Sequence, residues 1–226
     1  MAEQTIESAR MRTIVSTLGP LLKTAGFSKR RHSFNRRMAD GVVHVVNFWM
    51  APKEPPAWTP VPGLRERLYG SFRLDYGVFV PEMTRMGVPR ADWVNEYDCH
   101  LRRTAGQLAR GNDDADLWWW LADDGALDAA RANLLDRGLP WLERFPSRLG
   151  VLNAFSADGA LAIGMSPAGA LDIADVWRAI GDPSRERRVL EEYLREPVLA
   201  SHARYLATYL EAHGHGALVR LIETRP

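Results

Sequence analysis

The chain has a single cysteine, Cys99, among its 226 residues. No intramolecular disulfide can therefore form, and a zinc site built on several cysteines is excluded. This cysteine usage is typical of a reducing compartment, so we expect a cytoplasmic protein. No apolar run approaches the ~18 residues of a membrane helix. The first residues also lack the basic and apolar segments of a secretory signal, and we therefore expect no membrane partner.

An excess of charge of one sign is also missing. The 29 lysines and arginines nearly balance the 28 aspartates and glutamates, which gives a formal net charge of +1. Such a chain has no long-range field to attract polyanions, so any basic site must be local. The composition, 46% apolar and 25% charged, is that of a folded globular protein, and the length is sufficient to bury a sizeable core.

The first half of the chain predicts a helix followed by a sheet. Apolar residues over 6–25 recur with the helical period, and Gly26 is a suitable end for that helix, whereas Pro20 should kink or divide it. Ala39-Asp40-Gly41 is a hairpin turn signal. Alternating residues predict strands at 33–38, 42–50, 72–80 and 97–103. In the last of these, Tyr97, Cys99 and Leu101 are expected to face the core.

The second half predicts helices. Their expected ranges are 124–137, 166–180, 182–195 and 199–213. The fold class is therefore α+β: an N-terminal helix packed on a four- to five-stranded antiparallel sheet, followed by an all-helical C-terminal half. We expect a sheet domain at 1–122 and a helical region at 123–226, which can also form one continuous domain.

Several short motifs, in their order, resemble a bacterial family described as domain of unknown function 4304. They are Gly26-Phe27-Ser28-Lys29, Phe34-Asn35-Arg36, Val45-Val46-Asn47-Phe48, the strand from Phe72 to Val78, Cys99-His100-Leu101-Arg102-Arg103 and Leu117-Trp118-Trp119. The resemblance covers roughly residues 8–145. Trp49 departs from it, because a polar residue commonly follows the Asn-Phe pair. The family has no established activity, so the resemblance supports the fold alone.

The outward face of the predicted sheet is the main candidate for a binding surface. Antiparallel sheets often leave one face to solvent, but this face is richer in arginine, asparagine and aromatic residues than solvation requires. The candidate residues are Asn35, Arg37, Asn47, Trp49, Arg73, Asp75, His100 and Arg102. A loop over 51–63 with five prolines and Trp58 is a candidate rim.

Three functions are compatible with these residues. The first is a non-catalytic binding or adaptor protein, of immunity or regulatory type, that holds a protein partner on the polar face. The second is nucleic-acid binding through the basic segment Lys29–Arg37, although such charges also protect an edge strand from aggregation. The third is an enzyme with a pocket of His100, Asp75 and Arg73, which requires these side chains to share a cavity.

Other conspicuous residues have simpler explanations. Cys99 and His100 are adjacent in a predicted strand and point to opposite faces, so they cannot form a catalytic dyad. His202, His213 and His215 lack further ligands at a recognisable spacing, and no metal or cofactor is expected. The run Trp118-Trp119-Trp120 cannot bury all three indoles on one side, so at least one should lie at a surface or at a junction between layers.

Overall fold

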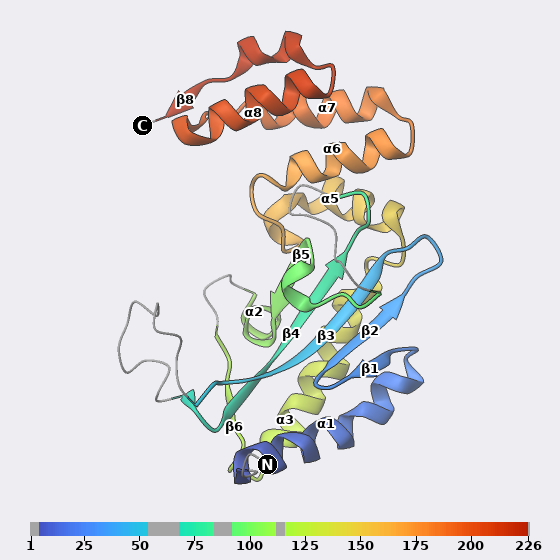
Figure 1. The fold of residues 1–226 in the computed structure, drawn as a ribbon, viewed down its shortest axis with the longest axis vertical. Helices are drawn as coiled ribbons and strands as arrows, with labels where there is room; N and C mark the ends of the chain where they lie inside the picture. The colour runs from blue at the N-terminus through green and yellow to red at the C-terminus, as the bar shows by residue number, and fades with distance from the viewer. Residues whose placement is uncertain (1–4, 54–67, 84–91, 112–115, 226) are drawn as a thin grey trace. The chain divides into compact units, whose positions relative to one another are not determined.

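The computed structural model describes residues 5–53, 68–83, 92–111 and 116–225 (Figure 1). The chain forms two compact units. Unit 1 comprises residues 1–81 and 88–159, and unit 2 comprises residues 82–87 and 160–226. Within the described ranges, no helix is long and apolar enough to cross a bilayer.

Unit 1 holds the sheet and the helices that pack on it. Its elements are α1 (Ile6–Thr24), β1 (Ser28–Arg30), β2 (Ser33–Arg37), β3 (Val43–Met50), β4 (Ser71–Phe79), η2 (Glu96–Asp98), β5 (Leu101–Thr104), α2 (Ala105–Arg110), β6 (Trp119–Trp120), α3 (Ala126–Asn133), η3 (Leu134–Gly138), α4 (Leu139–Glu143) and α5 (Arg148–Ala162). The last of these is interrupted by Gly159, whose backbone is not helical, and its residues after Gly159 belong to unit 2.

The N-terminal helix α1 is confirmed, with one difference. Thr5 caps it by accepting a hydrogen bond from the backbone N–H of Ser8. The helix continues through Pro20 and is not divided. It stops at Gly26, whose φ of 87° is the left-handed conformation that glycine adopts without strain, and Phe27 then donates its N–H to Leu22.

Within the described residues the sheet has six strands, and every pairing among them is antiparallel. The order is β1-β2-β3-β4-β5, and the short β6 pairs with the start of β4. The four predicted strands are thereby confirmed in part, since β5 begins only at Leu101. Two strands, β1 and β6, were not predicted.

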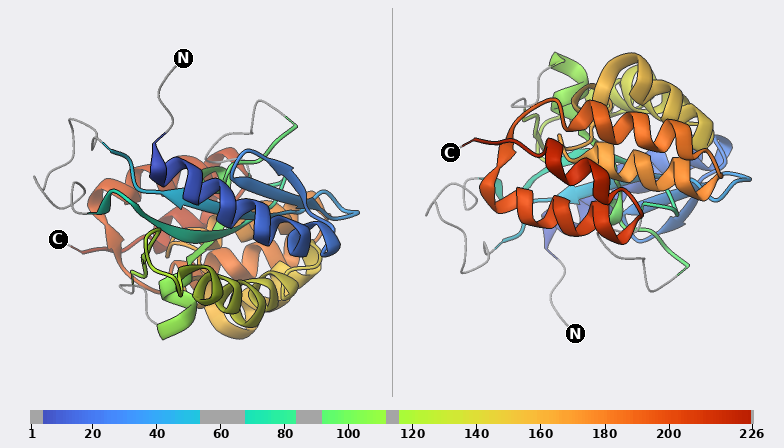
Figure 2. Two further views of the ribbon diagram at one scale, coloured as in Figure 1. Left: turned by 90° about the horizontal axis from the view of Figure 1, so that it is seen from below. Right: turned by 90° about the horizontal axis from the view of Figure 1, so that it is seen from above.

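One face of the sheet is covered by helices and forms the core. The register puts Phe34, Val46, Leu74 and Tyr76 on this face. The ring of Phe34 lies against Gly19 of α1. The hydroxyl of Tyr76 donates to Asn133 of α3 over 2.8 Å. In Figure 2, left, α1 lies in front of the strands that it covers.

The segment before β5 departs from the prediction. Residues 96–98 form a short 3₁₀ helix rather than a strand, and Tyr97 is exposed instead of facing the core. Cys99 is buried, but it lies over the other face of the sheet, against Gly77. The strand pattern was wrong here because Asn95 and Asp98 bond to each other and close a tight turn, which breaks the alternation.

The two units divide later in the chain than we expected. Residues 126–145 lie in unit 1 with the sheet, and Asn133 of α3 accepts a hydrogen bond from Tyr76 of β4. Gly138 shows how close this packing is: a Cβ there would lie 2.2 Å from the ring of Tyr76.

Unit 2 is helical apart from one pair of two-residue strands. Its elements are α6 (Gly169–Ala179), α7 (Pro183–Tyr193), β7 (Val198–Leu199), α8 (Ala200–Ala212), η4 (Gly216–Leu221) and β8 (Thr224–Arg225). Figure 2, right, shows its helices side by side. The expected start of α7 is confirmed, since Asp182 accepts from the N–H of Arg185. The first of these helices starts three residues after the expected cap, Ser166.

Candidate functional site

The sheet places the eight candidate residues on one face, opposite the helices. Opposing residues of an antiparallel pair share a face, and the pairs Ser33–Asn47, Asn47–Asp75, Trp49–Arg73 and Gly77–Arg102 connect four strands. We call this surface the polar face. The proline-rich stretch with Trp58 lies almost wholly outside the described residues.

The segment 92–100 crosses the polar face and covers its middle. Val43, Val45, Phe79, Val94 and Cys99 form a small apolar cluster beneath it. Gly77 makes this contact possible, because a Cβ at that position would lie 2.5 Å from the sulfur of Cys99. Burial raises the pKa of the Cys99 thiol well above its usual value. A buried, protonated thiol is a packing group rather than a nucleophile.

Two of the candidate residues, His100 and Arg37, hold this segment in place, and a third, Asn35, is buried within the sheet. The backbone N–H of Val80 donates to Nδ1 of His100 over 3.1 Å, and the imidazole lies against the ring of Phe79. Arg37 donates to the carbonyl of Asp92 over 3.2 Å. Asn35 is nearly buried between β1 and β3. These contacts favour a structural role for His100 and Arg37, and its burial favours the same role for Asn35.

Arg73 is enclosed by two indoles. Its guanidinium lies 5.0 Å from the ring of Trp49 and 5.1 Å from that of Trp118, and its Nε is 2.9 Å from a carboxylate oxygen of Asp75. Trp119 turns the other way and packs on Phe72. The tryptophan run thus contacts both faces of the sheet, and Trp120 is exposed, which confirms that the three indoles are not all buried on one side.

A small cavity of about 200 Å³ lies beside this cluster. Arg73, Asp75 and Arg102 line it, together with Glu96, Arg103, Thr104 and Gln107. Burial raises the pKa of Asp75 to about 6, and the nearby Glu96 acts in the same direction, whereas Arg73 opposes it. His100 is not among the residues that line this cavity. Asp75 and Arg73 therefore share this cavity without the third residue of the enzyme hypothesis.

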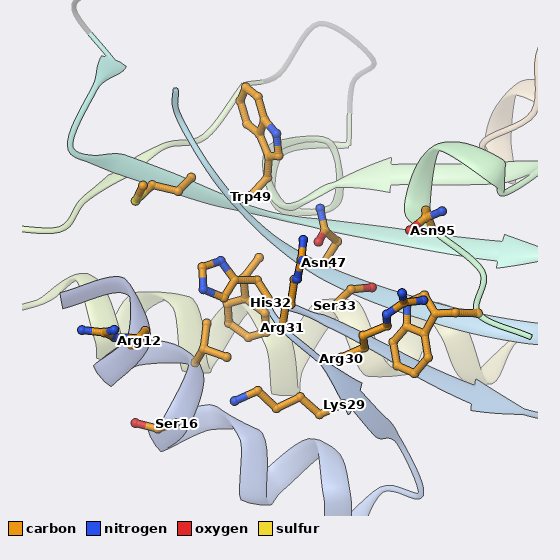
Figure 3. A pocket seen from close by; sticks show the side chains of 14 residues that line it. Arg12, Ser16, Lys29, Arg30, Arg31, His32, Ser33, Asn47, Trp49 and Asn95 are labelled. Atoms are coloured by element: carbon orange, nitrogen blue, oxygen red, sulfur yellow. The ribbon is translucent and has the colours of Figure 1, made fainter. Parts of the chain in front are cut away.

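A much larger groove, of about 1080 Å³, opens where α1, the β1–β2 turn and the end of β3 meet (Figure 3). Asn47 and Trp49 of the candidate set line it, with the indole of Trp49 turned away from Arg12 and Lys29. The remaining lining residues are Arg12, Val15, Ser16, Lys29, Arg30, Arg31, His32, Ser33, Phe48, Met50, Trp93 and Asn95. We call this the basic groove.

The charge of the basic groove is of one sign. Four of its residues are permanent cations, and no aspartate or glutamate belongs to the described lining. Arg12, Arg30 and Arg31 form no ion pair with any described residue. Burial lowers the pKa of the half-buried His32, and the charges of Lys29 and Arg12 lower it further. Like charges held together in this way favour an anionic ligand.

The backbone at the tip of the groove is strained. Arg31 has a φ of 56°, the only described residue other than glycine with a positive φ. It lies in a two-residue turn between paired Arg30 and Ser33, a position that glycine or asparagine usually occupies. Such strain costs about 1 to 3 kcal/mol and concentrates at functional sites. The turn at Arg31 is therefore a candidate functional position that borders the groove.

Sequence reasoning identified only part of this groove. The basic segment Lys29–Arg37 was singled out, but Arg36 and Arg37 point elsewhere: Arg36 donates to the carbonyl of Ala25, and Arg37 contacts Asp92. Arg12 and Trp93 gave no signal, because only the tertiary fold brings them to the same place. No family model, curated protein or solved structure matches the chain. Membership in the family that it resembles stays a prediction.

Proposed function

We propose that the protein is a non-catalytic binding protein whose basic groove holds an acidic segment of a protein partner. One observation carries the proposal: four permanent cations line a groove of about 1080 Å³ without an acidic residue in its described lining. A role of immunity or regulatory type is compatible with this binding function.

The balance of charges in the whole chain supports a local interaction. A net charge of +1 gives no long-range attraction, so the affinity must come from contacts made inside the groove. An acidic segment would pair its carboxylates with Arg12, Arg30 and Arg31, which have no partner of opposite charge among the described residues. Charge-assisted hydrogen bonds of this kind are stronger than neutral ones.

Single-stranded nucleic acid is the second candidate. The observation in its favour is that Trp49, Trp93 and His32 line the groove together with the cations. Bases stack on aromatic side chains while phosphates pair with basic ones, and the affinity then falls steeply with salt. The two candidates differ in ligand but share the groove.

The experiment is a comparison of two labelled ligands by fluorescence anisotropy. One is an aspartate- and glutamate-rich peptide of about ten residues, and the other is an oligothymidine of about ten nucleotides. We expect the peptide to bind, and the double variant Arg30→Glu, Arg31→Glu to weaken its binding by about tenfold or more. The matched control is Arg131→Glu, Arg137→Glu, which makes the same charge change at exposed positions of α3 and η3.

Each outcome decides between the candidates. Peptide binding that the groove variant weakens and the control leaves within about twofold supports the proposal. Binding of the oligothymidine alone, with the same response to the variants, replaces it with the nucleic-acid candidate. Equal losses in the groove variant and the control contradict both, because binding would then depend on total charge rather than on the groove.

A further inference from the structure

The end of β3 extends beyond the strand that pairs with it. The pairing of β2 with β3 begins at Ser33 and Asn47, and the N–H of Phe48 donates to the carbonyl of His32 over 3.0 Å. Before Ser33 the chain turns back into β1, so β2 does not extend further along β3. The strand β3 itself continues to Met50. Figure 1 shows β3 running past this turn.

The backbone groups of Met50 point toward that open side. Successive residues of a strand direct their N–H and C=O groups to opposite sides. The N–H of Ala51 donates to Ser71, which is on the β4 side, so the N–H and C=O of Met50 face away from β4. Among the described residues no strand pairs with Met50 on that side. This short free edge borders the basic groove, because Phe48 and Met50 both line it.

A free strand edge next to a groove is a known type of peptide site. An extended peptide can add to the edge, with main-chain hydrogen bonds that supply affinity and side-chain contacts that supply specificity. Cations beside an edge repel a second copy of the same basic edge. They attract a segment of opposite charge, so the groove favours an acidic strand over self-association. Nucleic acid has no regular ladder of donors and acceptors to match this edge.

We infer that the acidic segment binds by strand addition to β3 at Met50. The inference rests on the proposed function and adds the mode of recognition to it. The peptide accepts a hydrogen bond from the N–H of Met50 and donates its own N–H to the carbonyl of Met50. Its carboxylates, alternating along the strand, reach Arg31 at the β1–β2 turn and Arg12 on α1, which both line the groove (Figure 3).

The test removes one backbone donor without touching the sheet. Met50→Pro deletes the N–H that faces the groove, and it leaves the bonds between β3 and β4 in place because Met50 does not donate toward β4. Met50→Ala is the matched control, since it shortens the same side chain but keeps the N–H. We expect the proline variant to bind the acidic peptide about tenfold more weakly, and the alanine variant to stay within about twofold.

A second measurement leaves the protein unaltered. The same acidic peptide is prepared with N-methyl groups on alternate residues, in each of the two possible registers. N-methylation that blocks the donors facing β3 should abolish binding, whereas the other register should leave it nearly unchanged. This comparison decides the question even where the proline variant fails to fold.

The outcomes separate the mode of binding from the function. Strand addition is supported by a loss with Met50→Pro and with one methylated register only. It is overturned where both methylated peptides bind as the parent does while Arg30→Glu, Arg31→Glu still abolishes binding; the groove then binds acidic segments through side chains alone. Absence of any peptide binding to the unaltered protein overturns the proposed function itself.

Discussion

On the covered face of the sheet, the buried side chain of His44 is held in its neutral form. Nδ1 of His44 accepts from Arg36 over 2.9 Å, its Nε2–H donates to the carbonyl of Phe145 over 2.8 Å, and burial lowers its pKa to about 4. On the polar face, Asp75 is just as deeply buried, but charged groups surround it: Arg73, Glu96 and Arg102. The first face keeps its titratable group uncharged to protect a core, whereas the second retains charges.

This difference indicates which face of the sheet tolerates substitutions. Helices cover the first face, so substitutions there must fit an existing volume. Among the described residues, the segment 92–100 covers the middle of the polar face and Trp118 packs on Trp49 and Arg73, and Asn47 and Trp49 of this face also line the basic groove. A binding function requires such a surface, whose residues are not all committed to the core.

The largest expected effect is on the covered face. Leu74→Ala removes a fully buried side chain between the sheet and its helices, and we expect a loss of about 2 to 5 kcal/mol in the free energy of unfolding. Arg102→Ala on the polar face is the control; its side chain is about half exposed and pairs with Glu96, so the loss should be below about 1 kcal/mol. Urea unfolding measures both. Equal losses would contradict the division into a core face and a surface face.

The next effect concerns the segment that covers the polar face. Gly77→Ala places a Cβ 2.5 Å from the sulfur of Cys99, so the segment must shift, at a cost of about 1 to 3 kcal/mol. Gly125→Ala is the matched control, because a Cβ there meets no atom within 4 Å. Thermal unfolding compares the two variants. A Gly77→Ala variant as stable as the control would show that the segment is not held against the sheet.

The sequence predicts those features that depend on residues close together in the chain. Residues 72–76 alternate between apolar and charged side chains, which predicts a strand, and the strand forms at Ser71–Phe79. The strand β1 escaped prediction because its three residues are all exposed and carry no alternation. The alternation predicted that Cys99 and Leu101 face the same side of the sheet. The turn closed by Asn95 and Asp98 instead directs the side chain of Cys99 to the other face.

The candidate site illustrates the same limit. The alternation placed Asn47, Trp49, Arg73 and Asp75 on one face, and the register agrees. It contained no information on Arg12, which stands on the exposed side of a helix and reaches the groove only through the packing of α1. Nor did it predict that Arg31 occupies a strained turn. Local periodicity therefore identifies faces, whereas grooves arise from elements that are distant in sequence.

The smallest expected effect is the pH dependence that Asp75 contributes. Burial raises its pKa from 3.8 to about 6, so the folded protein holds a proton that the unfolded chain releases. The stabilisation from this proton is complete below the unfolded value and is lost as the pH rises through about 6. Between pH 5 and pH 8 the free energy of unfolding should fall by about 1 kcal/mol on account of this group.

Asp75→Asn isolates this contribution. Its neutral side chain has the shape of the protonated acid, so the variant should lack this loss of stability, and the difference between variant and parent should shift in favour of the variant at pH 8. The difference between variant and parent also cancels the contribution of His44 to the free energy of unfolding. The lowered pKa of His44 acts in the opposite direction, because the stabilisation by its neutral form is lost as the pH falls from about 6.5 toward 4. Urea unfolding of both proteins at the two pH values measures the shift. A difference that is the same at pH 5 and pH 8 would show that Asp75 is ionised throughout this range. The arginines around Asp75 would then compensate for its burial in full, and the contrast between the two faces would disappear.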